Sequence, residues 1–184
     1  MSFMLLGILN AQATGGGAGA FDLLETTTLT SSASSVTFSG LDAYSDYKHL
    51  QIRMVLQVDT TNTNLYMQMN SDTGANYSWH ALYGNGSSVA STGAGSQSYI
   101  RMVSFVPYGT TAEAFASSVI EILDFSNSNK NTTTRSISGN AGTPNRINLD
   151  SGSWQNTAAV TSIKLDNLGN NFVTGSRFSL YGVR

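Results

Sequence analysis

The segment KHLQIRMVLQV, residues 48–58, decides the fold class of this chain. Large apolar residues occupy every second position from Leu50 to Val58, and most of the residues between them are polar. A side-chain period of two cannot lie on one face of a helix, but it suits a β-strand with one buried and one exposed face. The segment therefore predicts a central strand of an antiparallel sandwich.

Further strand-like segments follow along the chain, separated by turns rich in Asn, Ser, Thr and Gly. So many short strands with almost no helix predict an all-β fold, an antiparallel two-sheet sandwich of the jelly-roll type. The run 85–98 is polar, glycine-rich and without periodicity, so it is predicted to be a long exposed loop, and 110–116 is predicted to form one helical turn. The other segments predicted to be strands are 21–30, 35–39, 62–70, 77–83, 99–107, 117–125, 132–138, 146–149, 159–165 and 177–182.

Length and composition indicate one domain with a polar, nearly neutral surface. The chain has 184 residues, which is long enough to bury a real core. Only 11% of them are charged, against roughly 25% in an average protein. This composition is typical of all-β proteins of virions and extracellular matrices. We expect a sandwich domain over 21–184, preceded by an arm and a glycine-rich hinge over 1–20.

Charge and cysteine usage exclude several kinds of partner and site. A net charge of −2 does not attract a phosphate backbone or an anionic membrane, so neither nucleic acid nor a membrane is an expected partner. The absence of cysteine excludes a disulfide framework and a thiolate zinc site. The fold must therefore be held by its core and by any contacts between subunits.

The N-terminal segment MSFMLLGILNAQA, residues 1–13, contains a short apolar run. It lacks the basic start of a signal peptide and is too short to span a bilayer. The run is followed by TGGGAGA, residues 14–20, which is a hinge by composition. We expect the arm to dock on a neighbouring subunit or back on its own domain. Its docking residues would be Phe3, Met4, Leu5, Leu6, Ile8 and Leu9.

The segment SSVIEILDF, residues 117–125, is apolar on both faces. In a two-layer sandwich only one face of a strand meets the core, so the second face requires a cover. The cover could be a loop, the N-terminal segment or another subunit. We expect oligomerisation, with Val119, Leu123 and Phe125 at the assembly interface together with the arm.

No motif indicates catalysis, and we expect no enzymatic activity, no cofactor and no metal. The glutamates are Glu25, Glu113 and Glu121, and most aspartates lie in or beside turns, where Asp caps backbone amides. The two histidines cannot form a three-histidine zinc site, and no GxSxG nucleophile elbow occurs. Calcium bound by loop oxygens stays open as an alternative.

Several aromatic residues could serve either a glycan site or the core. Trp79 and Tyr83, with Trp154 and Tyr181, could form a sugar-stacking platform. Aromatic residues of sandwiches also fill the core or its rim, and the sequence leaves both readings open for them.

Two segments carry a family resemblance: MNSDTGANYSWHALYGNGSS, residues 69–88, and GSRFSLYGVR, residues 175–184. With DLLETTTL and TFSGL earlier in the chain, they resemble a family of small structural proteins of tailed bacteriophages, particularly those of marine and cyanobacterial hosts. The resemblance covers most of 21–184, and Ser71 stands where the family pattern commonly has Gly. It implies that Gly74 supplies a turn conformation closed to other residues and that Phe178 and Leu180 bury the last strand.

The resemblance implies a virion protein and leaves two placements open. One is a capsid decoration or cement protein, a homotrimer that binds the major capsid protein or another virion protein through its arm and a strand face. The alternative is a tail-fibre or receptor-binding adhesin that binds a host glycan through Trp79 and Tyr83. The absence of a shaft favours decoration. Either protein would be made in the host cytoplasm and exposed on the virion.

Overall fold

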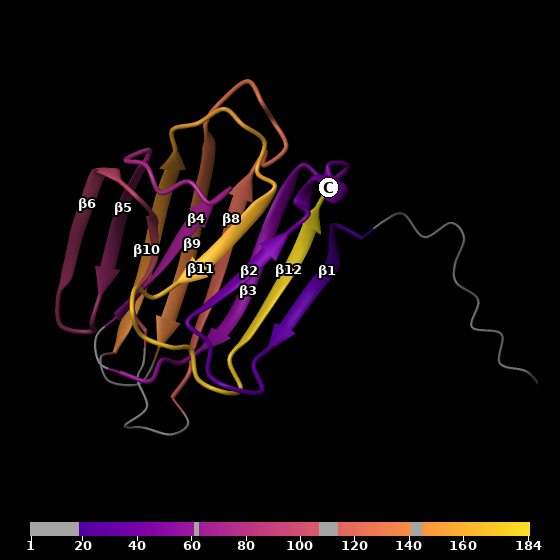
Figure 1. Cartoon of the computed structure of the whole chain (residues 1–184). Coiled ribbons are helices and arrows are strands. Elements are labelled where there is room, and N and C mark those ends of the chain that lie inside the picture. The colour runs from indigo at the N-terminus through magenta and orange to yellow at the C-terminus, as the bar shows by residue number, and fades with distance from the viewer. Residues whose placement is uncertain (1–18, 61–62, 107–113, 141–144) are drawn as a thin grey trace, which may run out of the picture.

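The computed structural model describes residues 19–60, 63–106, 114–140 and 145–184, and it confirms the all-β sandwich. Two antiparallel sheets of eight and four strands pack face to face (Figure 1). The arm residues 3–9 and most of the expected helical turn at 110–116 lie outside the described residues. The strands are β1 Phe21–Thr28, β2 Ser35–Ser39, β3 His49–Leu56, β4 Thr63–Met69, β5 Tyr77–Gly84, β6 Val89–Gln97, β7 Ile100–Val106, β8 Ala116–Leu123, β9 Thr132–Asn140, β10 Arg146–Trp154, β11 Ser162–Asp166 and β12 Arg177–Val183.

Eight of the strands form a jelly roll. Strands β1 to β4 alternate between the two sheets along the chain, and so do β7, β8, β11 and β12. The result is the order β1-β12-β3-β8 facing β2-β11-β4-β7, the double Greek key expected of this fold. Two hairpins, β5–β6 and β9–β10, extend the larger sheet beyond β8 in the order β9-β10-β5-β6.

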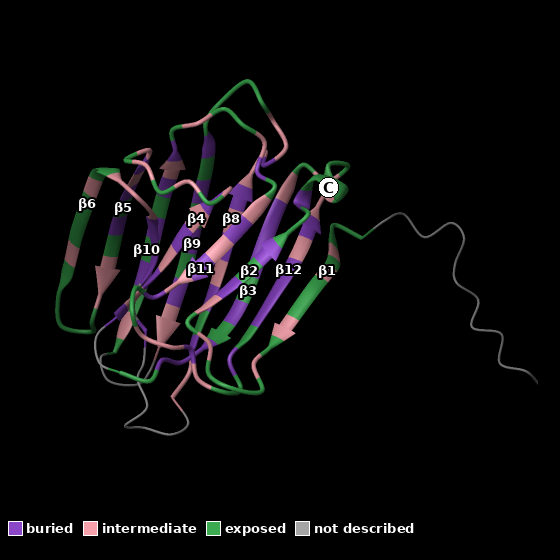
Figure 2. Ribbon diagram, in the orientation of Figure 1, coloured by how far each residue is buried: buried purple, intermediate pink, exposed green. Residues whose placement is uncertain are grey.

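Strand β3 lies inside the larger sheet, between β12 and β8, as its alternating sequence predicts. Leu50, Ile52 and Leu56 are fully buried, whereas Arg53 and Val55 are exposed on the opposite face. Figure 2 shows the same alternation of buried and exposed positions along neighbouring strands. Phe178 and Leu180 on β12 are also fully buried, as expected for the last strand.

The structure corrects the prediction of a loop over 85–98, because most of this segment forms strand β6. Its sequence VASTGAGSQ has no apolar periodicity, and it forms an edge strand because a tight turn returns it onto β5. In that turn the Asn85 side chain accepts hydrogen bonds from the backbone N–H groups of Ser87 and Ser88, at 3.0 and 2.8 Å. Gly86 takes a φ of 86°, in the region that favours glycine. The dipeptide Asn85-Gly86 was the signal that predicts such a hairpin.

The turn between β4 and β5 corrects the role expected of Gly74. Gly74 does not take a positive φ, and the left-handed residues are instead Asn70 and Ser71, with φ of 53° and 56°. A Cβ at position 74 would lie 2.8 Å from Asn76 Nδ2, so a larger residue there would displace the Asn76 side chain from Asp72. The Asp72 carboxylate organises the turn: it accepts hydrogen bonds from the Gly74 N–H at 2.8 Å, from Asn76 and, at 2.7 Å, from Trp154 Nε1.

The left-handed backbone at Ser71 generates a prediction. Replacing Ser71 by Gly relieves a steric cost of about 1–2 kcal/mol and adds an entropic cost of about 0.5–1 kcal/mol. We therefore expect Ser71→Gly to raise the free energy of unfolding by about 0.5 kcal/mol, measured by urea denaturation, and Ser71→Val to lower it. A Ser71→Gly variant clearly less stable than the parent would contradict this account of the turn.

A candidate interaction face on the larger sheet

Exposed large hydrophobic side chains gather on the outer face of the eight-stranded sheet, the face turned away from the four-stranded sheet. Of the nine such residues within the described part of the chain, eight lie on this face, and Leu168 lies in the β11–β12 loop. Isolated exposed hydrophobics are normal, but a cluster on one face usually marks an interaction site. The eight are Phe21, Leu23, Val55, Leu82, Val89, Ile137, Ile147 and Leu149.

The strand register aligns part of this cluster into a continuous row. Val119 on β8 pairs with Ile137 on β9, Ile137 with Leu149 on β10, and Leu149 with Leu82 on β5. Side chains at paired positions lie on the same face of a sheet and touch across it. These four residues, here called the apolar row, cross four neighbouring strands of the outer face.

Strands β9 and β10 have the reverse of the usual polarity. Their exposed outer positions include Ile137, Ile147 and Leu149, which are 50–58% exposed. Most of their inner positions are polar and buried, which is the opposite of what a sandwich exposed to water on its outer face requires. The buried inner residues are Thr132, Thr134, Ser136, Ser138, Asn148 and Asp150.

The register that turns these apolar residues outward is fixed by two residues of β10. Position 152 faces inward opposite Trp79 and Thr134, and a side chain there would collide with Ile100, because a Cβ would lie 2.3 Å from Ile100 Cγ2. Trp154 also faces inward, stacks beside Tyr77 and donates its indole hydrogen to Asp72. A slip by one residue would bury Leu149, but it would expel Trp154 from the core. The apolar outer positions are therefore a consequence of the core and not an error of pairing.

A row of polar side chains runs beside the apolar row, and its central charges neutralise each other. Arg135 is ion-paired with Glu121, and Gln51 Nε2 donates to Glu121 at 3.3 Å. Arg53 Nε donates in turn to the Gln51 side chain at 2.7 Å. The charges of Arg135 and Glu121 therefore cancel, and Arg53 keeps its positive charge while it is held by Gln51.

Two shallow hollows lie on either side of the Val119–Ile137 contact. One, of about 680 Å³, is lined by residues that include Leu82, Glu121 and Leu149. The other, of about 970 Å³, is lined by residues that include Arg53 and Ile147. The outer face is thus concave as well as apolar, which suits an inserted segment or a convex partner.

Aromatic residues bound the face near β1. The Arg53 guanidinium lies over the rings of Phe21 and Tyr181, 4.9 and 4.3 Å from their centroids. Such cation–π contacts hold the arginine against the sheet and leave its aliphatic part to extend the apolar surface.

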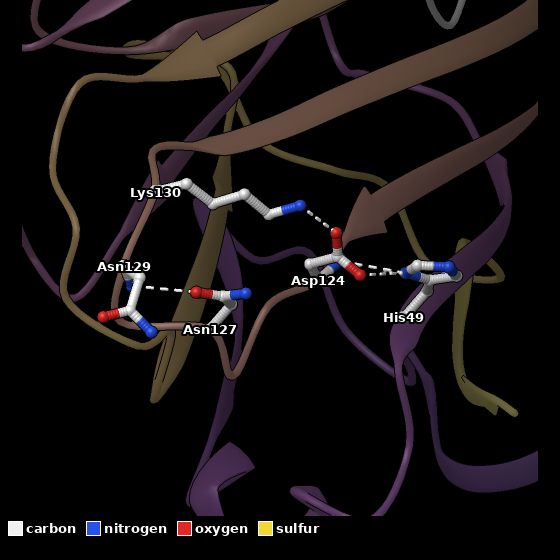
Figure 3. A network of polar contacts seen from close by, with 5 residues as sticks. All are labelled: His49, Asp124, Asn127, Asn129 and Lys130. Carbon is white, nitrogen blue, oxygen red and sulfur yellow. Dashed lines mark hydrogen bonds and ion pairs between the residues drawn. The ribbon is translucent and has the colours of Figure 1, made fainter.

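A polar network closes the β8–β9 hairpin at one end of the face (Figure 3). His49 Nδ1 accepts a hydrogen bond from the Asp124 backbone N–H at 2.9 Å, which requires that nitrogen to carry no proton. The Asp124 carboxylate, 3.4 Å from the same nitrogen, is bound instead by Lys130. The Lys130 hydrogen bond lowers the pKa of Asp124. Asp124 has a φ of 51°, so the network also holds a left-handed residue.

The residues expected at an assembly interface divide between face and core. Val119 and Leu123 point outward and are half-buried. Phe125 follows β8 and is fully buried in the core, so it cannot contact another subunit in this conformation. The exposed apolar residues of β9, β10 and β5 were not singled out from the sequence, although Ile147 and Leu149 alternate with Asn148 and Asp150.

The candidate glycan residues lie on the inner side of β5. Trp79 is 9% exposed and lies beneath the Arg101 guanidinium, 4.1 Å from its ring centroid. Tyr83 is partly exposed and is covered by Arg146, 4.2 Å from its ring centroid. The two side chains share one face of the strand but do not form an open stacking platform.

A buried ion pair lies beneath the apolar row. Arg101 Nη2 on β7 is 3.8 Å from Asp150 Oδ1 on β10, and the Asp150 side chain is fully buried. Burial raises the pKa of Asp150 to about 7, and the attraction of Arg101 only partly opposes the shift. Burial also lowers the pKa of Arg101. The pair connects the smaller sheet to the hairpin extension at an electrostatic cost.

The described residues contain no group of three His, Asp or Glu side chains that could hold a metal ion. Among the same residues, no helix is long and apolar enough to cross a membrane. No protein family, no curated protein and no solved structure matches this chain.

Shortening an isoleucine to alanine should affect stability differently on the two faces of the larger sheet. Ile122 on β8 is fully buried, and Ile122→Ala should lower the free energy of unfolding by about 2–5 kcal/mol. Ile137 on the neighbouring strand is half exposed, and Ile137→Ala should lower it by no more than about 1 kcal/mol, through its contacts with neighbouring side chains of the outer face. Urea denaturation of both variants checks the assignment. Equal losses would contradict this difference between the inner and the outer face.

The raised pKa of Asp150 predicts how stability depends on pH. The folded protein holds this proton up to about pH 7, whereas the unfolded chain releases it near pH 4. The contribution of Asp150 to stability is thus complete below about pH 4 and is lost as the pH rises to about 7. Between these values the free energy of unfolding falls by up to about 1.4 kcal/mol per pH unit. Asp150→Asn should remove this slope, measured as the difference between variant and parent. Parallel pH profiles would contradict the assignment.

Proposed function

We propose that this protein is a non-enzymatic structural protein of a bacteriophage virion, most specifically a capsid decoration or cement protein. The observation that carries the proposal is the inverted polarity of β9 and β10, which presents Ile137, Ile147 and Leu149 on the outer face. Apolar side chains so arranged are stabilised when another surface covers them. Attachment to the surface of a shell would supply such a cover.

The fold and the resemblance support the same function. Jelly rolls serve as viral capsid domains and as lectins, although a fold alone does not specify a function. The resemblance to small structural proteins of tailed bacteriophages favours the virion. The alternative, a glycan-binding adhesin, is weakened because Trp79 is buried beneath Arg101.

The mechanism is additive burial without chemistry. Each copy would place its outer face, aided by the apolar arm, against the major capsid protein or another virion protein, and copies would contact one another as a homotrimer. Burying apolar area contributes roughly 25 cal/mol per Å². Repeated at every position of a shell, even a modest contact stabilises the assembled state by mass action.

Electron density from intact particles tests the placement. We expect this chain at regular positions on the capsid surface, with the strands β8, β9 and β10 turned toward the shell. Density only at the tail, with the β5–β6 end of the sandwich outermost, would contradict decoration and favour adhesion.

A variant on the face tests the contact itself. The double change Ile137→Asp and Leu149→Asp should abolish co-sedimentation with undecorated shells, because it places two charges in the apolar row. The matched control is Thr37→Asp, an exposed position on the outer face of the smaller sheet, which should co-sediment as the parent does. Circular dichroism would establish that both variants remain folded. Wild-type attachment by the double variant would exclude this face as the contact.

A further inference from the structure

The outer face lacks a cover within the described residues, and the chain carries one segment with matching chemistry. Residues 3–9, FMLLGIL, contain six large apolar side chains and no charge. We propose that this segment docks on the outer face of its own chain in the free protein, along the apolar row of Val119, Ile137, Leu149 and Leu82.

The charge pattern of the face favours an uncharged occupant. Glu121 already interacts with Arg135 and Gln51, and Arg53 with Gln51 and two aromatic rings. A charged segment would have to disrupt these contacts in order to pair with Glu121, Arg135 or Arg53, and it would lose its hydration. An apolar segment gains from the row and the hollows beside it without breaking those pairs.

The length of the connection fits docking within one chain. The segment is joined to Phe21, the first residue of β1, by the 11 residues 10–20. From β1 to β9 are four strand spacings, about 19 Å across the sheet. Phe21, at the start of β1, is level with His49 on β3, and the apolar row is level with Arg53. The distance along the strands is therefore about 14 Å. The total span is about 24 Å.

A connection of 11 residues reaches at most about 36–40 Å, so the span is accessible. A glycine-rich connection of this length has an average end-to-end distance of about 17–20 Å. Effective concentration is greatest when this average is close to the span, and for short connections it is on the order of millimolar. Docking on the same chain is therefore favoured over exchange between copies in dilute solution.

In the free protein residues 3–9 would cover the apolar row, and the shell would displace them when it binds. Shielding of the apolar row would keep the free copies apart, and a shell that binds the row would release the segment. The displacement step rests on the proposed function, whereas docking in the free protein does not.

The absence of cysteine allows a direct test on the full-length protein. A Ser2→Cys variant carries one nitroxide spin label, and its paramagnetic broadening is measured on the backbone amides. We expect the amides of Ile137 and Leu149 to lose most of their intensity. The amides of Thr37 and Lys164, on the outer face of the four-stranded sheet, should keep theirs. Uniform or absent broadening of the outer-face amides would overturn the proposal.

Changes in the segment test its chemistry. Leu5→Asp with Leu6→Asp should remove the broadening on β9 and β10, whereas the matched control Gln12→Asp, in the connection, should leave it. The amide spectrum itself shows whether each variant is folded. Broadening that survives the change at Leu5 and Leu6 would exclude an apolar contact.

A mixed sample separates docking within a chain from exchange. Isotope-labelled protein without a spin label is combined with spin-labelled protein of natural isotopic abundance. We expect no broadening, and broadening of the outer-face amides there would overturn docking within one chain in favour of exchange between copies. If residues 3–9 dock on the outer face but the protein does not bind shells, the proposed function alone would be rejected.

Discussion

A sheet can bury only one of its faces in a two-layer sandwich, and this constraint governs the protein. The four-stranded sheet packs on the inner face of β12, β3 and β8, which carries buried apolar residues such as Phe178, Ile52 and Ile122. Beyond β8 the larger sheet is wider than its partner, and β7 packs on β9, β10 and β5. There most inner positions of β9 and β10 are polar, and Ile137, Ile147 and Leu149 lie on the outer face. The part of the larger sheet that extends beyond β8 thus has large apolar side chains on its outer face.

Two inward residues of β10 hold this arrangement. Gly152 leaves the space that Ile100 fills, and Trp154 connects β10 to the Asp72 turn. Because side chains alternate along a strand, fixing these two fixes Leu149 and Ile147 outward. The surface proposed to bind a partner is therefore positioned by the core, which makes it rigid. Rigid surfaces lose little conformational entropy on binding.

Local patterns predicted much of the sandwich. The alternation in 48–58 and the short intervals between strands were sufficient for an all-β jelly roll, and Ser35–Ser39 has the expected bounds. Strand β6 was missed because its small, polar residues have no periodicity and pair only through the Asn85-Gly86 turn. The role predicted for Gly74 was wrong because its backbone is not left-handed; the residue instead lies close to the Asn76 side chain.

The sequence by itself determined which residues alternate, and hence the fold class, the central strand and the dual apolar character of β8. It could not determine which face of each hairpin strand turns inward, because Phe125, Trp79 and Leu149 are all apolar and only packing distinguishes them. The tertiary structure placed Phe125 in the core, Trp79 beneath Arg101 and Leu149 on the surface. The physical reason is that facing depends on register, and register is fixed by contacts between residues far apart in the chain, such as Trp154 with Asp72.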